Sequence, residues 1–289
     1  MNKRINKEIS HESLMIPPAV VPPFVREIGR RATDIGLSHA VVEVFGEAGI
    51  TFEVEGDHLQ DTEKKGLLIA SDHQQTIEPW FSQGLMGVSD RSASHVIGKP
   101  SSLQCRLIDH ISDQSEGLIL PVVPGTFAAE KKGRDLINND TWARVRHSSL
   151  VRPKKELASI NQTAMDRATS LVGEREAVTI YPTGTTEDAA EAPWRRGLGS
   201  IVQGLRPEAH DDAHLVLLSP ERASKAKIIS ALSLRHLGIR PRPQTIVLRT
   251  ANLGTPRELF GESLTTDGHE AAQALTDTMR EHYIDRFAA

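Results

Sequence analysis

Two residues that could act together in proton transfer lie five positions apart, between Gly66 and Pro79. His73 follows a short apolar run, Leu67 to Ala70, and Glu78 stands just before Pro79. A run of this length between turn residues predicts a buried strand. An imidazole at the carboxyl end of such a strand can deprotonate a hydroxyl, while a nearby carboxylate orients the ring. The competing interpretation is a surface histidine in a polar loop.

The spacing limits where the two side chains can lie. Five residues turn a continuous helix by about 140°, so His73 and Glu78 cannot share one helical face. The pair works only if His73 lies in a loop and Glu78 lies in the first turn of the next helix. We expect that helix over Thr76 to Met86, with Pro79 in its first turn. Asp72 is the weaker partner for His73, because side chains of adjacent residues point apart.

A second segment has the same form, a strand followed by a polar turn. The strand is expected at Val178 to Tyr181, and the turn has the sequence Pro182-Thr183-Gly184-Thr185-Thr186. Such a turn can present backbone N–H groups to an anion, although a plain strand-to-loop turn has the same composition. Arg195, Arg196 and Gly197 follow the turn and add two positive charges.

Together these segments resemble the glycerolipid acyltransferase family, of the lysophosphatidic acid acyltransferase type. That family has a strand, a glycine-containing turn, a second strand, then a histidine, four residues and an aspartate. Here the run from Val54 leads to His73, and Glu78 takes the place of the aspartate. The second segment resembles the family's strand that ends in Pro-Glu-Gly-Thr-Arg, and Arg195-Arg196-Gly197 matches the basic-basic-Gly that commonly follows. The two segments lie roughly a hundred residues apart, as in the family.

The resemblance implies transfer of an acyl group from an acyl thioester, either acyl-CoA or an acyl carrier protein, to a small hydroxyl acceptor. His73 would be the general base and Glu78 would orient its ring. No metal or bound cofactor would be needed, because the thioester brings its own leaving group. The resemblance and the polar turn together give these candidate substrate-binding residues: Lys99, Thr183, Gly184, Thr185, Thr186, Arg195 and Arg196.

The chain departs from the family pattern at charged positions. The family's glutamate falls on Thr183 and its arginine on Thr186, and that arginine normally pairs with the phosphate of a glycerophosphate acceptor. The stretch Gly117 to Val123 also lacks an expected arginine. Two alternatives therefore stay open. One is an acyltransferase with a non-phosphate or amine acceptor in specialised metabolism, and the other is a non-catalytic member of the fold that binds lipid or a partner.

Composition narrows the function classes. The chain has 289 residues, of which 38% are hydrophobic and 25% charged, as in an ordinary globular protein. A net charge of −4 and an aromatic content of 4% argue against nucleic-acid binding. The single cysteine, Cys105, excludes a disulfide framework and a cysteine zinc site, and we expect it to be buried. The residues His210-Asp211-Asp212-Ala213-His214 have metal-ligand side chains, but they are expected to lie in a polar loop, so we expect no metal there. We expect a cytoplasmic location, with peripheral contact at the inner membrane face as the alternative.

The N-terminal part, residues 1–45, is predicted to be an arm followed by a helix. Apolar residues recur at helical spacing over Phe24 to Leu37, with arginines on the rest of the turn. We favour a helix packed on the core over a basic amphipathic helix lying on a membrane. No apolar run approaches the roughly 20 residues that a membrane helix needs.

Residues 46–289 are predicted to form an acyltransferase-like α/β domain. Its strands and helices alternate, which predicts a mostly parallel central sheet covered by helices on both faces, with an N-terminal helical segment. Expected strands are Ile50 to Val54, Leu67 to Ala70, Ser94 to Ile97, Leu118 to Val123, Val178 to Tyr181, Leu215 to Leu218 and Thr245 to Leu248. Expected helices are Thr76 to Met86, Leu103 to Ile111, Glu156 to Val172, Leu198 to Leu205, Ala223 to Leu237 and Glu270 to Phe287.

Basic residues are frequent late in the chain. They are Lys225, Lys227, Arg235, Arg240 and Arg242, preceded by Arg195 and Arg196. Coenzyme A phosphates or an acidic acyl carrier protein would need such a patch, whereas most charge runs are solvated faces.

Overall fold

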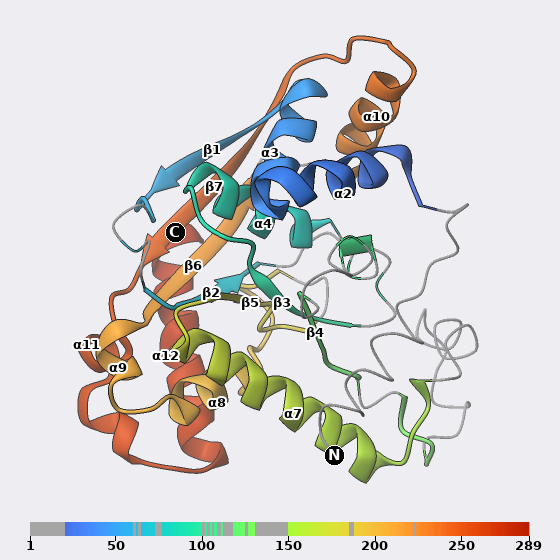
Figure 1. Ribbon diagram of the computed structural model, residues 1–289. Coiled ribbons are helices and arrows are strands. Elements are labelled where there is room, and N and C mark those ends of the chain that lie inside the picture. Colours follow the sequence, from blue (N-terminus) through green and yellow to red (C-terminus); the bar gives the residue numbers. More distant parts are fainter. Residues whose placement is uncertain are drawn as a thin grey trace.

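The described part of the chain forms a seven-stranded sheet with helices on both faces, so the predicted α/β class with an N-terminal helical segment is confirmed (Figure 1). The computed structural model describes residues 21–59, 62, 65–72, 77–99, 102, 105, 107, 108, 111, 118–124, 127–130, 150–184, 188–221 and 224–288. The strands are β1 (Ile50–Gly56), β2 (Leu67–Ser71), β3 (His95–Gly98), β4 (Ile119–Pro121), β5 (Ala177–Ile180), β6 (His214–Glu221) and β7 (Gln244–Asn252). The longer helices are α2 (Pro23–Ile35), α3 (Leu37–Glu47), α4 (Glu78–Val88), α7 (Lys154–Gly173), α8 (Gly197–Gly204), α10 (Lys225–His236) and α12 (His269–Phe287).

The strand order is β1-β7-β6-β2-β5-β3-β4. Every neighbouring pair is parallel except β6 and β7, which are antiparallel. The five strands β6, β2, β5, β3 and β4 therefore run in one direction, and their carboxyl ends meet at one edge of the sheet, which we call the carboxyl edge. Ligands of open α/β sheets bind at such edges.

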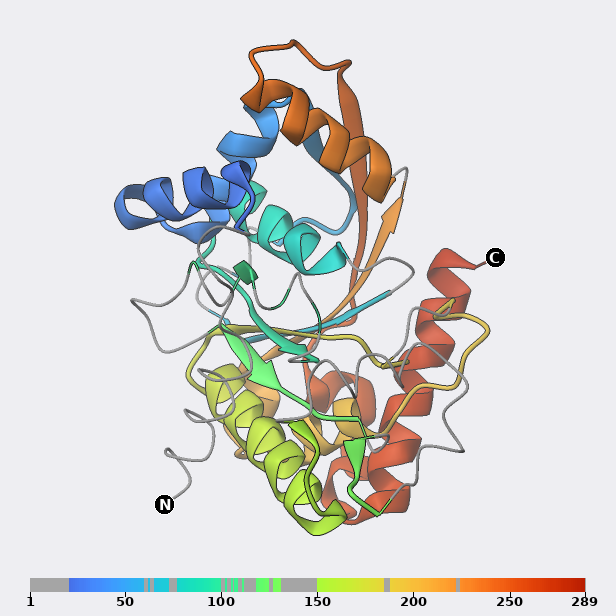
Figure 2. The same ribbon diagram turned by 90° about the vertical axis from the view of Figure 1, so that its right-hand side faces the viewer.

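Two apolar clusters sandwich the sheet (Figures 1 and 2). The first contains residues of α2, α3, α4 and α10, and the second contains residues of α7, α8 and α12. Strand β2 contributes to both, because alternate side chains point to opposite faces: Leu67 and Ile69 to the first, Leu68 and Ala70 to the second. All five residues of β2 are buried, which explains its continuous apolar sequence.

The N-terminal helix packs on the core, as the favoured interpretation predicted. Val25 and Ile28 of α2 are fully buried in the first cluster. Two of its three arginines bind a carboxylate: Arg30 and Arg31 donate to Glu27 and lower its pKa to about 2. The following helix α3, which the sequence analysis did not predict, joins the same cluster. The boundary between an N-terminal part ending at residue 45 and an α/β domain starting at residue 46 stays a prediction.

In the part of the chain that the structure describes, no helix is long and apolar enough to cross a membrane.

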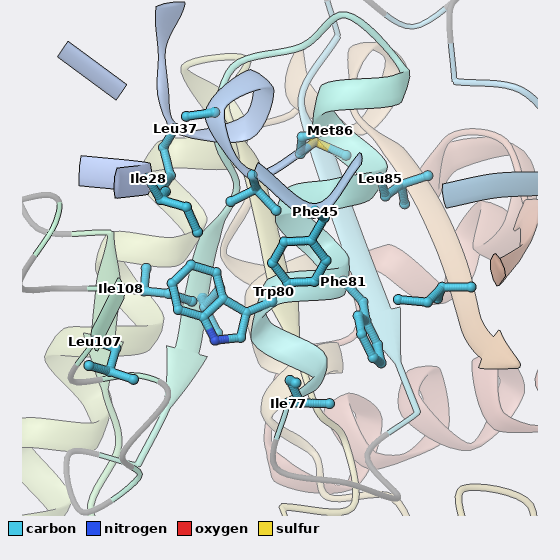
Figure 3. Close-up of a cluster of buried hydrophobic side chains, with 14 of the residues drawn as sticks. Ile28, Leu37, Phe45, Ile77, Trp80, Phe81, Leu85, Met86, Leu107 and Ile108 are labelled. Atoms are coloured by element: carbon cyan, nitrogen blue, oxygen red, sulfur yellow. The ribbon is translucent and has the colours of Figure 1, made fainter. Parts of the chain in front are cut away.

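Helix α4 is held firmly on the first face. Trp80 and Phe81 are almost fully buried and lie among Ile28, Phe45 and Ile108 (Figure 3). The amide of Gln83, also buried, binds both the backbone N–H and the carbonyl of Ser94, at 3.0 and 2.8 Å. These contacts fix where the helix begins.

Most predicted elements agree with the structure to within a few residues. Helix α4 begins at Glu78, two residues later than predicted, with Pro79 in its first turn. The predicted helix over Leu103 to Ile111 is helical at its described residues 105, 107, 108 and 111, and Cys105 is buried as expected.

We predict that Gly199→Ala destabilises the fold through the contact of α8 with α12. A Cβ at Gly199 would overlap the carbonyl oxygen of Ala272, and the backbone N–H of Gly199 donates to Thr276 Oγ1 at 3.0 Å. Separating the helices should lower the free energy of unfolding by roughly 1–3 kcal/mol, measured by urea denaturation.

The matched control is Gly46→Ala in α3, where a Cβ would meet nothing within 4 Å. That substitution should raise the free energy of unfolding by roughly 0.5–1 kcal/mol, because it removes backbone freedom from the unfolded chain. Equal effects of the two substitutions would contradict the close-packing argument.

Candidate functional site

The two polar segments found in the sequence meet at the carboxyl edge. Strand β2 pairs with β5 in parallel, with Ala70 opposite Ile180. Asp72 follows β2 directly, and the turn Tyr181 to Gly184 follows β5. Residues roughly a hundred positions apart in the chain are thus brought side by side. His73 and the three residues after it lie outside the described residues, and so do Thr185 and Thr186.

Glu78 is placed where the pairing with His73 requires it. It is the first residue of α4, so it lies in the first helical turn, and it is only 4% exposed. The partial positive charge at a helix N-terminus stabilises a carboxylate there. Within the described residues, Asp72 and Glu78 are the only buried carboxylates. Burying a carboxylate is costly, and two of them at one sheet edge mark a candidate functional site.

Tyr181 lies beside Glu78 on the first face of the sheet. Burial raises the pKa of the Tyr181 hydroxyl well above its usual value, and the nearby charge of Glu78 raises it further. A hydrogen bond with Ser82 acts in the opposite direction. The phenol therefore stays protonated at physiological pH. This places an O–H group close to the Glu78 carboxylate.

Asp72 lies on the opposite face of the sheet from Glu78 and Tyr181. Its carboxylate is a hydrogen-bonding neighbour of the Tyr283 hydroxyl, which also lies 3.2 Å from Ser219 Oγ. Burial raises the pKa of Tyr283, and the charge of Asp72 contributes in the same direction. The Tyr283 ring contacts that of Trp194, with centroids 5.5 Å apart. The C-terminal helix α12 thereby touches the residue before His73 and the residue before Arg195.

Arg195 covers the turn that follows β5. Its backbone N–H donates to the carbonyl of Pro182 at 2.9 Å, and its Nε donates to the carbonyl of Thr183 at 3.1 Å. Gly184 has a φ of 69°, a left-handed conformation that suits glycine, and a Cβ there would contact the Arg195 guanidinium. Thr183 is 3% exposed, whereas Arg195 and Arg196 are exposed. Arg196 precedes α8 as its N-cap residue.

The remaining residues predicted to bind substrate, and the late basic residues, lie at separate places in the fold. Lys99 follows β3 directly and is half-buried at the carboxyl edge. Arg195 and Arg196 lie with α8 on the second face, while Lys225 and Lys227 lie on α10, which packs on the first face. The seven late basic residues therefore do not form one patch.

The segment His210 to His214, which we expected to be a polar loop, instead forms the end of the short helix α9 (Ala209–Asp212) and the start of β6, and its polar side chains have partners elsewhere in the fold. His210 contacts the carbonyl of Val202, and His214 contacts Asn252. Asp211 pairs with Arg257, and Asp212 with Lys65 and Arg175. Among the described residues, no group of three metal-ligating side chains is present.

The two tyrosines were missed by the sequence analysis. They are the only tyrosines in the chain, and each is buried beside one of the two buried carboxylates. Tyr181 could have been noticed because it ends the predicted strand of the second segment, directly before Pro182. Tyr283 lies in the last helix, and only the folded chain brings it to Asp72.

Comparison with known proteins adds no family assignment. No protein-family model matches the chain, and no curated protein matches it significantly.

We predict that Asp72 and Tyr283 are energetically coupled. Tyr283→Phe removes a hydroxyl from a buried carboxylate and should lower the free energy of unfolding by about 1–3 kcal/mol. In a double-mutant cycle with Asp72→Asn, measured by urea denaturation, the coupling energy should exceed about 0.5 kcal/mol.

The control cycle pairs Asp72→Asn with Tyr181→Phe. Tyr181 lies with the first cluster, on the opposite face from the ring of Tyr283, so these two substitutions should be additive. Additive effects in both cycles would contradict the proposed contact.

Proposed function

We propose that this chain transfers an acyl group from an acyl thioester to a hydroxyl acceptor, with His73 as general base and Glu78 as the carboxylate that orients it. The observation that carries the proposal is the parallel pairing of β2 with β5. It brings Asp72, the residue before His73, and the turn with Thr183 to one sheet edge. The buried Glu78 in the first turn of α4 supports the same assignment.

In the proposed reaction the acceptor hydroxyl attacks the thioester carbonyl carbon while His73 takes its proton. The new C–O bond forms a tetrahedral oxyanion, and the C–S bond then breaks. The imidazolium returns the proton to the departing thiolate, which leaves as a free thiol. Glu78 would hold the ring in position and stabilise the imidazolium. Tyr181 lies on the same face of the sheet as Glu78, and the charge of that carboxylate raises the pKa of the Tyr181 hydroxyl.

Arg195 would supply the positive charge that the turn lacks at Thr186. It is bound to the carbonyl of Thr183 and otherwise exposed, so it can reach an anion bound at this turn. An arginine pairs well with phosphate oxygens, which both coenzyme A and a glycerophosphate acceptor carry. This restores a phosphate-bearing substrate as the first candidate, with a non-phosphate or amine acceptor as the alternative. A cytoplasmic location belongs to the same proposal.

We predict that His73→Ala lowers acceptor-dependent thiol release by about 10²–10⁴-fold, because the general base is removed. The assay would follow free thiol from acetyl-, octanoyl- and palmitoyl-CoA. Acceptors would be glycerol 3-phosphate, lysophosphatidic acid, 1-octanol and a primary amine. Glu78→Gln should lower kcat with little change in KM, because it acts through His73.

The control variant is His269→Ala, an exposed histidine at the start of α12, and its activity should equal that of the wild type. Thiol release that His73→Ala leaves unchanged would overturn the proposed mechanism. If all donors fail with the wild-type chain, the same series on acyl carrier protein donors decides between catalysis and the non-catalytic alternative.

We predict that Arg195→Gln raises KM for a phosphate-bearing substrate by about tenfold or more, with a smaller change in kcat, because a charge-assisted hydrogen bond is lost. The control is Arg206→Gln, an exposed arginine just beyond α8. An unchanged KM for Arg195→Gln with every phosphate-bearing donor and acceptor would favour binding of the anion elsewhere.

A further inference from the structure

One end of the molecule combines positive charge with exposed aliphatic side chains. Helix α10 and residues 237–243, which connect it to β7, form a projecting tip at the end of the molecule (Figures 1 and 2). We call this region the α10 tip. It lies on the first face of the sheet, beside the N-terminal half of α2.

The charge of the α10 tip is one-sided. No aspartate or glutamate occurs between Glu221 and Glu258, in a chain whose net charge is −4. Some basic residues of this stretch are neutralised: Arg235 pairs with Glu47, Arg249 with Glu221, and Arg257 with Asp211.

Besides Lys225, three basic residues of the tip are exposed: Lys227, Arg240 and Arg242. Within the described part of the chain, no carboxylate forms an ion pair with any of the three. A groove lined by Arg26, Glu27, Arg30, Arg235 and His236 joins the tip to α2, and in it Arg30 pairs with Glu27 and Arg235 with Glu47.

Exposed aliphatic side chains gather at the same place. The described residues include four large hydrophobic side chains that are exposed, and three of them are Ile229, Leu237 and Ile239 of the tip. Leu237 is 71% exposed and Ile239 is 52% exposed, on either side of Gly238. A single exposed leucine is ordinary, but clustering inside a basic stretch indicates a docking surface.

We propose that the α10 tip docks on an anionic lipid bilayer. Aliphatic side chains on a projecting loop can enter the headgroup region, while flanking arginines contact lipid phosphates and keep their stems along the apolar boundary. Nucleic acid would use the charges but leave Leu237 and Ile239 in water. An acidic protein would need a preformed recess for a convex tip, which a deformable bilayer does not.

The test is sedimentation of the full-length chain with vesicles of phosphatidylcholine alone and with phosphatidylglycerol added. The chain should bind only the anionic vesicles, and binding should weaken as salt is raised. Arg240→Gln with Arg242→Gln should lower the partition coefficient by roughly twentyfold, since each basic residue near an anionic leaflet contributes about fivefold. Leu237→Ser with Ile239→Ser should lower it by about tenfold.

Two matched controls come from elsewhere on the surface. Lys154→Gln with Lys155→Gln removes the same charge at the start of α7, on the other face of the sheet. Ile35→Ser removes the fourth exposed aliphatic side chain, which is 40% exposed at the end of α2. Both controls should bind vesicles within about twofold of wild type. Circular dichroism would show that every variant is folded.

Failure of the wild-type chain to bind anionic vesicles would overturn the proposal. Binding that the two tip variants and the two controls reduce equally would also overturn it. If the chain instead binds an acidic polypeptide such as poly-glutamate, loses that binding in the tip variants and ignores vesicles, then the tip is a protein-docking surface and the lipid proposal is wrong. The measurement requires no catalytic activity, so its result is independent of the proposed acyl transfer.

Discussion

The pairing of β2 with β5 and β6 is the constraint on which the rest of the site depends. Because β2 is buried on both faces, its register cannot slip by one residue without exchanging Leu67 and Ile69 for Leu68 and Ala70 between the two apolar clusters. The register in turn sets which residues stand at the carboxyl edge. Asp72 and the Tyr181 turn are neighbours because Ala70 is opposite Ile180.

The same alternation separates the two buried carboxylates. Asp72 lies with Tyr283 and the second cluster, whereas Glu78 lies with Tyr181 and the first. The Tyr283 hydroxyl hydrogen-bonds with the Asp72 carboxylate and offsets part of its desolvation, while Tyr181 lies near Glu78. The residues on either side of the undescribed positions 73–76 are thus held by different helices: Asp72 contacts Tyr283 of α12, and Glu78 is the first residue of α4.

Much of the fold followed from periodicity. The apolar runs at β2 and β5 and the helical spacing of α7 and α12 were sufficient to predict the layers, and Pro79 indicated a helix beginning close to Glu78. The sequence could not predict the strand order, because non-local pairing leaves no local pattern. It also could not assign Tyr283 to Asp72, since a tyrosine in an amphipathic helix is typical of a core position. Helix α3 was missed because Gly36 separates it from α2 by a single residue.

The position of the candidate orienting carboxylate is decided by apolar packing. Glu78 and Pro79 begin α4, and the next two residues, Trp80 and Phe81, are locked in the first cluster (Figure 3). Proline in the first turn fixes the backbone there, so the helix cannot begin earlier or later without displacing the Trp80 ring. A glutamate is one methylene longer than the aspartate of the family pattern. Because its backbone is fixed on this side, the extra length changes how far the carboxylate extends from the start of α4.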